Sequence, residues 1–302
     1  IRAPQKPTNI KLLPTESEVA ISWENSDDED LKEVLIIRKV NSASESRRDG
    51  IQVYKGVGET VTDTDITPNT QYFYTFFTKD TSGNSSKPFS VTTIIRDLSV
   101  PLDIEESKDF GEVEVSLAGT TEVKPNQTIK AAQITIPTGG EFKLAANAAI
   151  EVETFEVNGG DIVLEDGNIT AENISLDADS KLEIAGDATI ETEELNLGAG
   201  EMTLESATIE AEVIELDTGG SMEISADAEI IVEDLSVGAG EISIGAAELV
   251  ATTVELEDSG KITIDAADAA VTIETLSLPA GAEVKFDSGV TTVTKIELGG
   301  DF

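Results

Sequence analysis

Acidic side chains are the residues of this chain with the clearest capacity for chemistry. Four of them follow one another in the segment Asp27-Asp28-Glu29-Asp30. Carboxylate oxygens are hard ligands of the kind that calcium prefers. Asp27, Asp28 and Asp30 are therefore candidate calcium ligands, and calcium is the one cofactor that the sequence suggests. The alternative is a solvated acidic loop with no bound ion.

Other acidic pairs exist, such as Asp177/Asp179 and Glu193/Glu194, but 60 Asp and Glu residues produce neighbours by chance. Cysteine and histidine are both absent. Their absence excludes disulfides, thiolate chemistry, zinc sites built from Cys and His, and a histidine base. We therefore name no catalytic residue and expect no enzymatic activity.

The net charge of −40 is concentrated in the second part of the chain. Residues 1–97 carry a net charge of −3 and the remaining residues −37, with no Lys or Arg between Lys181 and Lys261. Such a surface repels nucleic acid and anionic lipid. No apolar run approaches the roughly 20 residues that span a membrane. We expect neither a nucleic-acid partner nor membrane insertion. The acidic surface either keeps a long molecule soluble or binds divalent cations diffusely.

The first 97 residues have the composition of a separate module, with all three Tyr and the only Trp. Short runs of alternating apolar residues are separated by turn signals such as Asp49-Gly50 and Ser82-Gly83-Asn84. This pattern predicts an antiparallel sandwich. The expected strands are residues 8–12, 19–23, 34–40, 52–55, 60–64, 71–79 and 89–95.

Several segments of this module resemble the fibronectin type III domains of bacterial surface proteins. They are Pro7, Ile21-Ser22-Trp23, Ile66-Thr67-Pro68-Asn69-Thr70-Gln71-Tyr72 and Asp80-Thr81-Ser82-Gly83-Asn84-Ser85. The stretch from Ile66 to Tyr72 resembles a tyrosine corner, in which the Tyr72 hydroxyl bonds the backbone a few residues upstream. The resemblance places Trp23 in the core and implies a spacer or a binding module.

From Phe142 onward the chain repeats every twenty residues. A fixed period of short alternating runs is typical of stacked repeats. The recurring pairs are Phe142/Leu144, Ile162/Leu164, Leu182/Ile184, Met202/Leu204, Met222/Ile224, Ile242/Ile244 and Ile262/Ile264. The position that precedes each strand is Gly140, Gly160, Ser180, Gly200, Gly220, Gly240 and Gly260.

Two further apolar pairs in each repeat predict three short strands per coil, hence a parallel β-solenoid. Right-handed winding is the default for parallel crossovers. We expect an all-β chain with three parts: a sandwich at 1–97, a linker or cap at 98–120, and about nine coils over 121–302. The pattern continues to Phe302 without a capping helix, so we expect either further chain or a second subunit to cover that end.

Among the outward residues of the third predicted strands, Ser or Asn separates one glutamate from the next along the stack. These outward residues are Glu156, Ser175, Asn196, Glu215, Ser236, Glu255, Ser277 and Glu297. Like charges on neighbouring strands repel. The spacing of the glutamates therefore reduces repulsion along the stack and does not indicate a catalytic array.

The repeats are similar to those of filamentous haemagglutinin-type adhesins, for example in Gly167-Asn168-Ile169-Thr170-Ala171 and Ile174-Ser175-Leu176. Bactofilin-like cytoskeletal solenoids are a second resemblance. The attached fibronectin-like module favours the outside of the cell. These resemblances imply a structural protein of the bacterial surface.

Three functions follow as hypotheses. The first is an extracellular structural protein, a filament subunit that binds itself head to tail, or an adhesin stalk that contacts other cell-surface components. The second is a β-helix enzyme acting on polysaccharides, which the uniform coil length disfavours because a cleft needs inserted loops. The third is ice or carbohydrate binding, which needs a regular Thr or aromatic row that the outward positions lack.

Overall fold

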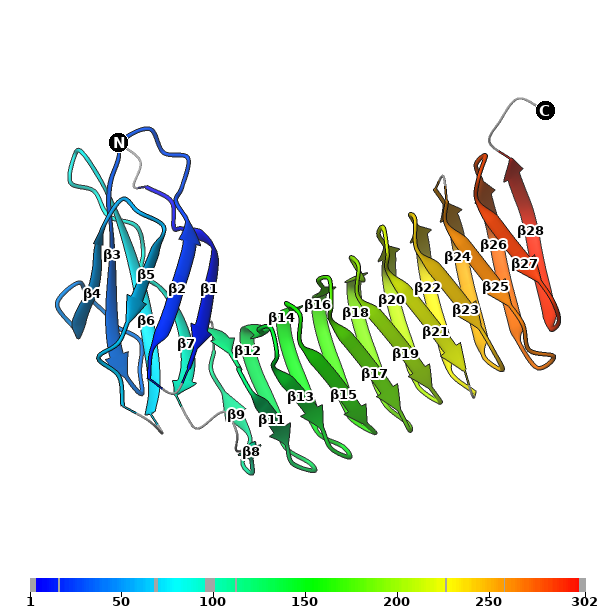
Figure 1. The fold of residues 1–302 in the computed structure, drawn as a ribbon, viewed down its shortest axis with the longest axis horizontal. Helices are drawn as coiled ribbons and strands as arrows, with labels where there is room; N and C mark the ends of the chain where they lie inside the picture. The colour runs from blue at the N-terminus through cyan, green and yellow to red at the C-terminus, as the bar shows by residue number, and fades with distance from the viewer. Residues whose placement is uncertain are drawn as a thin grey trace.

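The computed structural model describes residues 4–15, 17–67, 70–95, 101–111, 113–225, 227–257 and 259–298. The described residues form β-strands and turns, with a compact module at one end and a long stack of coils at the other (Figure 1). Among them, no helix has the length and apolar character that crossing a bilayer requires.

Seven antiparallel strands build the N-terminal sandwich, which confirms the predicted set with ends shifted by a few residues. One sheet has the order β1-β2-β5, and the other begins β4-β3-β6-β7. The strands are β1 (Thr8–Pro14), β2 (Val19–Glu24), β3 (Leu31–Val40), β4 (Ile51–Gly56), β5 (Thr60–Asp63), β6 (Thr70–Asp80) and β7 (Phe89–Ile95).

The sandwich core forms around Trp23, which is 3% exposed. Its ring meets Tyr54 and Phe76 edge-on, with centroids 5.0 and 5.7 Å apart, a preferred geometry for aromatic pairs. The Tyr72 hydroxyl accepts a 2.9 Å hydrogen bond from the Thr67 backbone N–H. The predicted core position and tyrosine-corner bond are thus confirmed, whereas Pro68 and Asn69 of that stretch lie outside the described residues.

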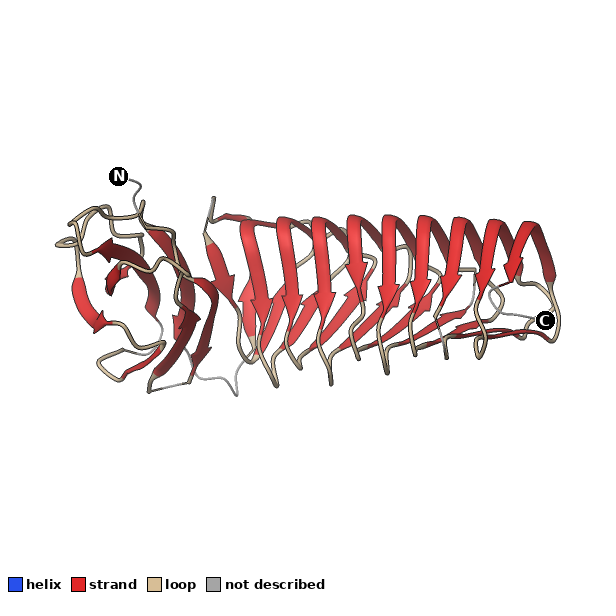
Figure 2. Cartoon of the chain, turned by 90° about the horizontal axis from the view of Figure 1, so that it is seen from above, coloured by secondary structure: helices blue, strands red, loops and turns tan. Residues whose placement is uncertain are grey.

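The rest of the chain winds into a parallel β-solenoid built from two kinds of strand (Figure 2). Short strands form a 10-stranded sheet: β8 (Leu102–Ile104), β11 (Thr120–Val123), β13 (Glu141–Leu144), β15 (Asp161–Glu165), β17 (Lys181–Ala185), β19 (Glu201–Glu205), β21 (Ser221–Ser225), β23 (Glu241–Ile244), β25 (Lys261–Ile264) and β27 (Glu283–Phe286). The other strands continue the sandwich sheet: β9 (Lys108–Asp109), β10 (Glu114–Ser116), β12 (Thr128–Ile136), β14 (Ala149–Val157), β16 (Asn168–Leu176), β18 (Thr189–Asn196), β20 (Thr208–Leu216), β22 (Glu229–Val237), β24 (Glu248–Leu256), β26 (Ala270–Leu278) and β28 (Val290–Leu298).

The prediction of three strands per coil is wrong in its count. The second and third apolar runs of a coil lie in one long strand, such as β16, because the backbone bends between them without leaving the extended conformation. The bend shows in the exposure pattern: Glu172 and Asn173 are consecutive and both exposed, whereas Ala171 and Ile174 on either side are buried. Alternation is therefore interrupted once per long strand.

The predicted linker over 98–120 is also corrected. In its described part, β8 pairs in parallel with β11, and β9 and β10 pair with β12. These residues thus form a first coil in register with the others, which makes ten coils where nine were expected. Val115 and Leu117 of this coil are buried in the solenoid core, so this coil contributes to the core as the later coils do.

The solenoid core has a repeat of two coils. On the inner side of the bend, Ala131, Ala171, Ala211 and Ala251 recur every 40 residues, and larger side chains occupy the intervening coils. Near the sandwich, Phe142 and Phe155 pack edge-on inside the solenoid with centroids 5.9 Å apart. The remaining core is almost wholly aliphatic, so successive coils pack by shape.

Glutamates are separated in one outward row but not in another. The predicted row from Glu156 to Glu297 is confirmed as a set of register partners. At the bend, however, glutamate recurs in five successive coils. We call this row the corner column, and it consists of Glu153, Glu172, Glu193, Glu212 and Glu233. The acidic pair Glu193/Glu194 provides the two outward residues of one such bend.

Candidate functional site: the cleft between sandwich and solenoid

The two modules share one sheet, because β7 of the sandwich pairs in parallel with β10 of the first coil. Two hydrogen bonds involving Ser116 strengthen this junction. The Ser116 hydroxyl donates to the Leu12 carbonyl oxygen at 3.1 Å, and the Thr93 hydroxyl donates to the Ser116 carbonyl oxygen at 3.1 Å. Both bonds are buried, so the pairing of the modules is fixed by the backbone as well as by side chains.

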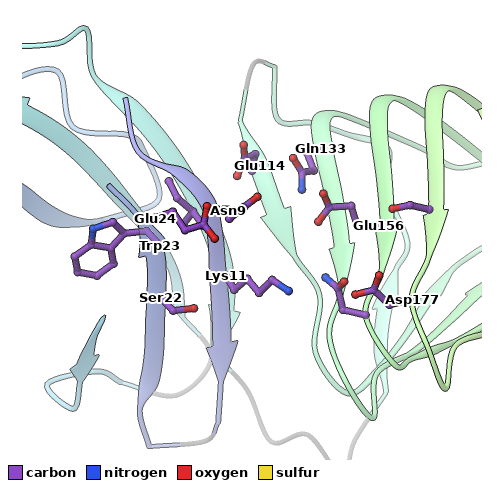
Figure 3. A pocket seen from close by; sticks show the side chains of 12 residues that line it. Asn9, Lys11, Ser22, Trp23, Glu24, Glu114, Gln133, Glu156 and Asp177 are labelled. Carbon is purple, nitrogen blue, oxygen red and sulfur yellow. Dashed lines mark hydrogen bonds between the residues drawn. The ribbon is translucent and has the colours of Figure 1, made fainter. Parts of the chain in front are cut away.

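Beside this junction lies a cleft of about 550 Å³. Strands β1 and β2 form one wall, and the outward rows of β10, β12, β14 and β16 form the other (Figure 3). Most of the lining is polar: Asn9, Lys11, Ser22, Glu24, Glu114, Gln133, Glu156, Asn158, Ser175 and Asp177, with Ile10 and Trp23. Sequence reasoning missed this cleft, because its walls are about 100 residues apart in the chain.

Electrostatics distinguish the cleft from the rest of the acidic surface. Burial raises the pKa of Glu114 to about 7; Lys6 opposes this rise and Glu156 adds to it. Burial also raises the pKa of Glu156, with Lys11 opposing and Asp177 adding. Taking a carboxylate out of water favours its neutral form. One carboxyl of the cleft therefore exchanges its proton near neutral pH.

Lys11 is the single basic residue in the lining of the cleft. Figure 3 shows it extending from β1 toward the solenoid, where Glu156 and Asp177 face it. One ammonium group against four lining carboxyl groups leaves an excess of negative charge unless protons are taken up. The chemistry that this arrangement offers is proton uptake and hydrogen bonding at the junction of the modules.

The calcium candidates lie away from the cleft lining, in the loop between β2 and β3. One Asp28 carboxylate oxygen accepts hydrogen bonds from the Gln5 backbone N–H at 2.7 Å and from the Ser26 hydroxyl at 3.0 Å. The Asp30 carbonyl oxygen accepts from the Thr81 backbone N–H at 3.0 Å. Asp28 and Asp30 thus tie this loop to neighbouring segments. Across the described ranges, three or more acidic side chains nowhere gather in a geometry that holds a metal ion.

A buried charge network inside the sandwich also went unpredicted. Arg38 and Asp63 are 4% and 5% exposed, and one Arg38 nitrogen lies 2.8 Å from both Asp63 carboxylate oxygens. The Tyr74 hydroxyl donates to Asp63 at 3.1 Å. Burial, together with Asp63, raises the pKa of Tyr74, so the hydroxyl remains a donor. An arginine directly after the apolar run Val34–Ile37 was the available signal.

No family model matches the chain, and no curated protein matches it. Solved structures similar to it are fibronectin type III-like β-sandwich domains. The fn3 domain of human contactin 1 is 17% identical, with a TM-score of 0.28; the match covers 32% of this chain and 82% of that one. The twitchin kinase region from C. elegans is 16% identical, with a TM-score of 0.27, and covers 32% of this chain and 17% of that one. Chitinase ChiA74 from Bacillus thuringiensis is 22% identical, with a TM-score of 0.25, and covers 32% of this chain and 14% of that one.

Proposed function

We propose that this chain is a non-catalytic structural protein of the bacterial cell surface. In this proposal it is an extracellular filament subunit whose solenoids stack end to end. The observation that carries the proposal is the apolar surface of the last described coil. Phe286, Ile296 and Leu298 are 52%, 56% and 54% exposed, whereas Ile264 and Leu276 one coil earlier are 1% exposed.

The same coil leaves the edges of both sheets open within the described residues. Strands β27 and β28 each pair on one side only, with β25 and β26. An unpaired strand edge is a template for strand addition. The opposite edge of the longer sheet is β4, where Ile51 is 55% exposed. Contact between these two edges of different copies does not close on itself and produces a filament.

An alternative is a monomeric adhesin stalk that presents the sandwich to other cell-surface components. The pairing of β7 with β10 favours it, because a shared sheet holds the sandwich rigidly at the end of the solenoid. Both functions use the solenoid as a stiff spacer, and they differ in what covers the last coil.

Sedimentation velocity over a wide range of concentrations, with negative-stain electron microscopy, tests the proposal. Self-assembly predicts fibres or end-to-end oligomers that disappear in the double variant Phe286→Lys, Ile296→Lys. Leu13→Lys, which alters a residue 49% exposed on β1, is the matched control and leaves assembly intact. A strictly monomeric wild-type protein, with and without millimolar calcium, contradicts the filament and supports the stalk.

A further inference from the structure

A groove runs along the side of the solenoid, across the long strands β18 to β26. It has a volume of about 510 Å³ and follows the inner edge of the bend. Its lining divides into a floor at the bend, one side that holds glutamates and aliphatic residues, and one side that is mainly acidic. The residues are Thr192, Ala211, Val232 and Ala251 at the bend, Glu191, Glu210, Ile231, Val250 and Thr272 on one side, and Glu212, Glu233, Thr252 and Glu274 on the other.

The residues of the floor point into the solenoid core, where Val232 and Ala251 are 4% and 2% exposed, so the backbone at the bend forms the base of the groove. Ala211 and Ala251 occupy the bend in alternate coils, and Val232 lies between them. Beside this floor, Ile231 projects outward and is 39% exposed, directly after the buried Ile230. Its register partner Val250 is partly exposed. Two aliphatic side chains thus stand next to each other in an outward row that holds Glu191 and Glu210 in the preceding coils.

The walls carry charge that the protein itself does not neutralise. Glu191 and Glu210 lie on one side, and Glu212, Glu233 and Glu274 on the other. None of the ion pairs between described residues reaches these five side chains. The sequence places no Lys or Arg between Lys181 and Lys261. A partner with positive charge is therefore complementary to the walls.

We propose that this groove binds an extended, cationic polypeptide segment in which basic residues alternate with aliphatic ones. In an extended chain, alternate side chains point to opposite sides. A chain lying along the groove would turn its aliphatic side chains to Ile231 and Val250 on one side. Its basic side chains would then face Glu212, Glu233 and Glu274 on the other side. Five coils at about 4.8 Å per step span about 19 Å, which matches roughly six extended residues.

The exposed aliphatic residues of the groove favour a peptide over other charged ligands. A nucleic acid is repelled by the glutamates. A simple cation gains nothing from Ile231 and Val250. The groove lies on the side of the solenoid, whereas the proposed stacking uses its ends, so neither proposal depends on the other.

Isothermal titration calorimetry on the full chain in 150 mM NaCl tests this assignment. The probes are two acetylated nine-residue peptides, one of alternating Lys and Val and one of alternating Lys and Ser. The groove variant is Ile231→Ser, Val250→Ser, with Ile231→Thr, Val250→Thr as a second variant that keeps β-branched side chains. Val163→Ser, an outward valine on β15 of the other sheet, is the matched control.

We expect one binding site for the Lys/Val peptide and an increase in Kd of about tenfold in the groove variant, because apolar contact area is lost. Val163→Ser leaves the Kd unchanged, and the Lys/Ser peptide binds weakly and equally to all forms. Glu212→Gln, Glu233→Gln, Glu274→Gln weakens binding more than the exposed control set Glu165→Gln, Glu183→Gln, Glu223→Gln. Equal affinity of wild type and both groove variants overturns the proposal, as does equal weakening by the two glutamine sets.

Discussion

The hydroxyl of Ser116 donates a buried 3.1 Å hydrogen bond to the carbonyl oxygen of Leu12, 104 residues earlier in the chain. Ser116 lies in the first coil of the solenoid, and Leu12 lies in the sandwich. The bond lies beside the pairing of β7 with β10. It fixes the second sheet of the sandwich to the same coil that continues the first.

Ser116→Ala tests this connection. The variant leaves the buried Leu12 carbonyl without this donor, and we expect a loss of about 1 to 2 kcal/mol in the free energy of unfolding. Ser225→Ala is the matched control, because the Ser225 hydroxyl donates to Leu204 at the same 3.1 Å but within the solenoid. Urea unfolding measures both. Small-angle scattering that changes in S116A and not in S225A supports the junction role, and identical profiles contradict it.

Tyr72→Phe removes the hydroxyl that accepts the Thr67 N–H and closes the tyrosine corner. We expect the sandwich to lose about 1 to 2 kcal/mol, because a backbone donor in a partly buried turn loses its acceptor. Tyr54→Phe is the comparison: its hydroxyl accepts from Gly58 at 2.6 Å in an exposed loop, where water replaces it. Near-ultraviolet circular dichroism during urea unfolding measures the difference. Equal losses in the two variants would contradict the role of the corner.

The raised pKa of Glu114 predicts that the stability of the protein changes with pH. Its folded pKa is about 7 and its ordinary value is 4.5, so the folded state holds this proton over a range in which the unfolded state has lost it. Below about pH 4.5 both states are protonated and the group has no effect. Between pH 4.5 and 7 ionisation of this group stabilises the unfolded state. The free energy of unfolding therefore falls by an amount on the order of 3 kcal/mol.

Glu114→Gln removes this dependence. We expect the free energy of unfolding of the variant to equal that of wild type near pH 4.5 and to be larger than that of wild type at pH 8. Urea unfolding at both pH values measures it. Glu183→Gln, on an exposed position of β17, controls for the general effect of removing one negative charge. A difference between E114Q and wild type that is the same at both pH values, or the same as that of E183Q, would refute the assignment.

Gly220, Gly240 and Gly260, which precede short strands of the solenoid, lie in close contact with the backbone of a neighbouring coil. A Cβ at Gly260 would lie 2.3 Å from the Val237 carbonyl oxygen, whereas at Gly245 it would lie 3.2 Å from the Ile224 carbonyl oxygen. We expect Gly260→Ala to lower stability by about 1 to 3 kcal/mol and Gly245→Ala to have a smaller effect. Thermal unfolding of the two variants measures this order, and a reversed order would exclude the steric explanation.

Ser180 shows how one turn tolerates a side chain. Its hydroxyl donates to the Val157 carbonyl oxygen at 2.8 Å and accepts from the Gly159 N–H at 2.9 Å, and the residue is fully buried. Serine can therefore replace glycine at this position of the repeat, because its hydroxyl is hydrogen-bonded to the neighbouring coil.

Periodicity predicted the solenoid because one inward residue, such as Ile162 or Leu164, recurs at each step of a regular stack. Local signals also sufficed for the strands of the sandwich, whereas the Tyr72 bond was expected from the resemblance to a tyrosine corner. The bend in the long strands was not predicted, because extended backbone on both sides of Glu172 produces the same apolar pairs as two separate strands. The winding hand stays a prediction.

The cleft could not be predicted from the sequence, for a different reason. Lys11 and Glu156 approach each other only after β7 has paired with β10, and no local pattern indicates that pairing. The raised pKa of Glu114 likewise depends on burial by a module that begins elsewhere in the chain. Long-range placement, and not residue type, determines this site.

The shared sheet also determines how the molecule responds to tension. The hydrogen bonds between neighbouring coils lie along the stack, so a pull on its two ends loads them one row after another instead of shearing many at once. Each coil that gives way releases about twenty residues, or roughly 70 Å of extended chain. Under force the solenoid lengthens in equal steps, which lets a stiff rod absorb a sudden load by yielding coil by coil.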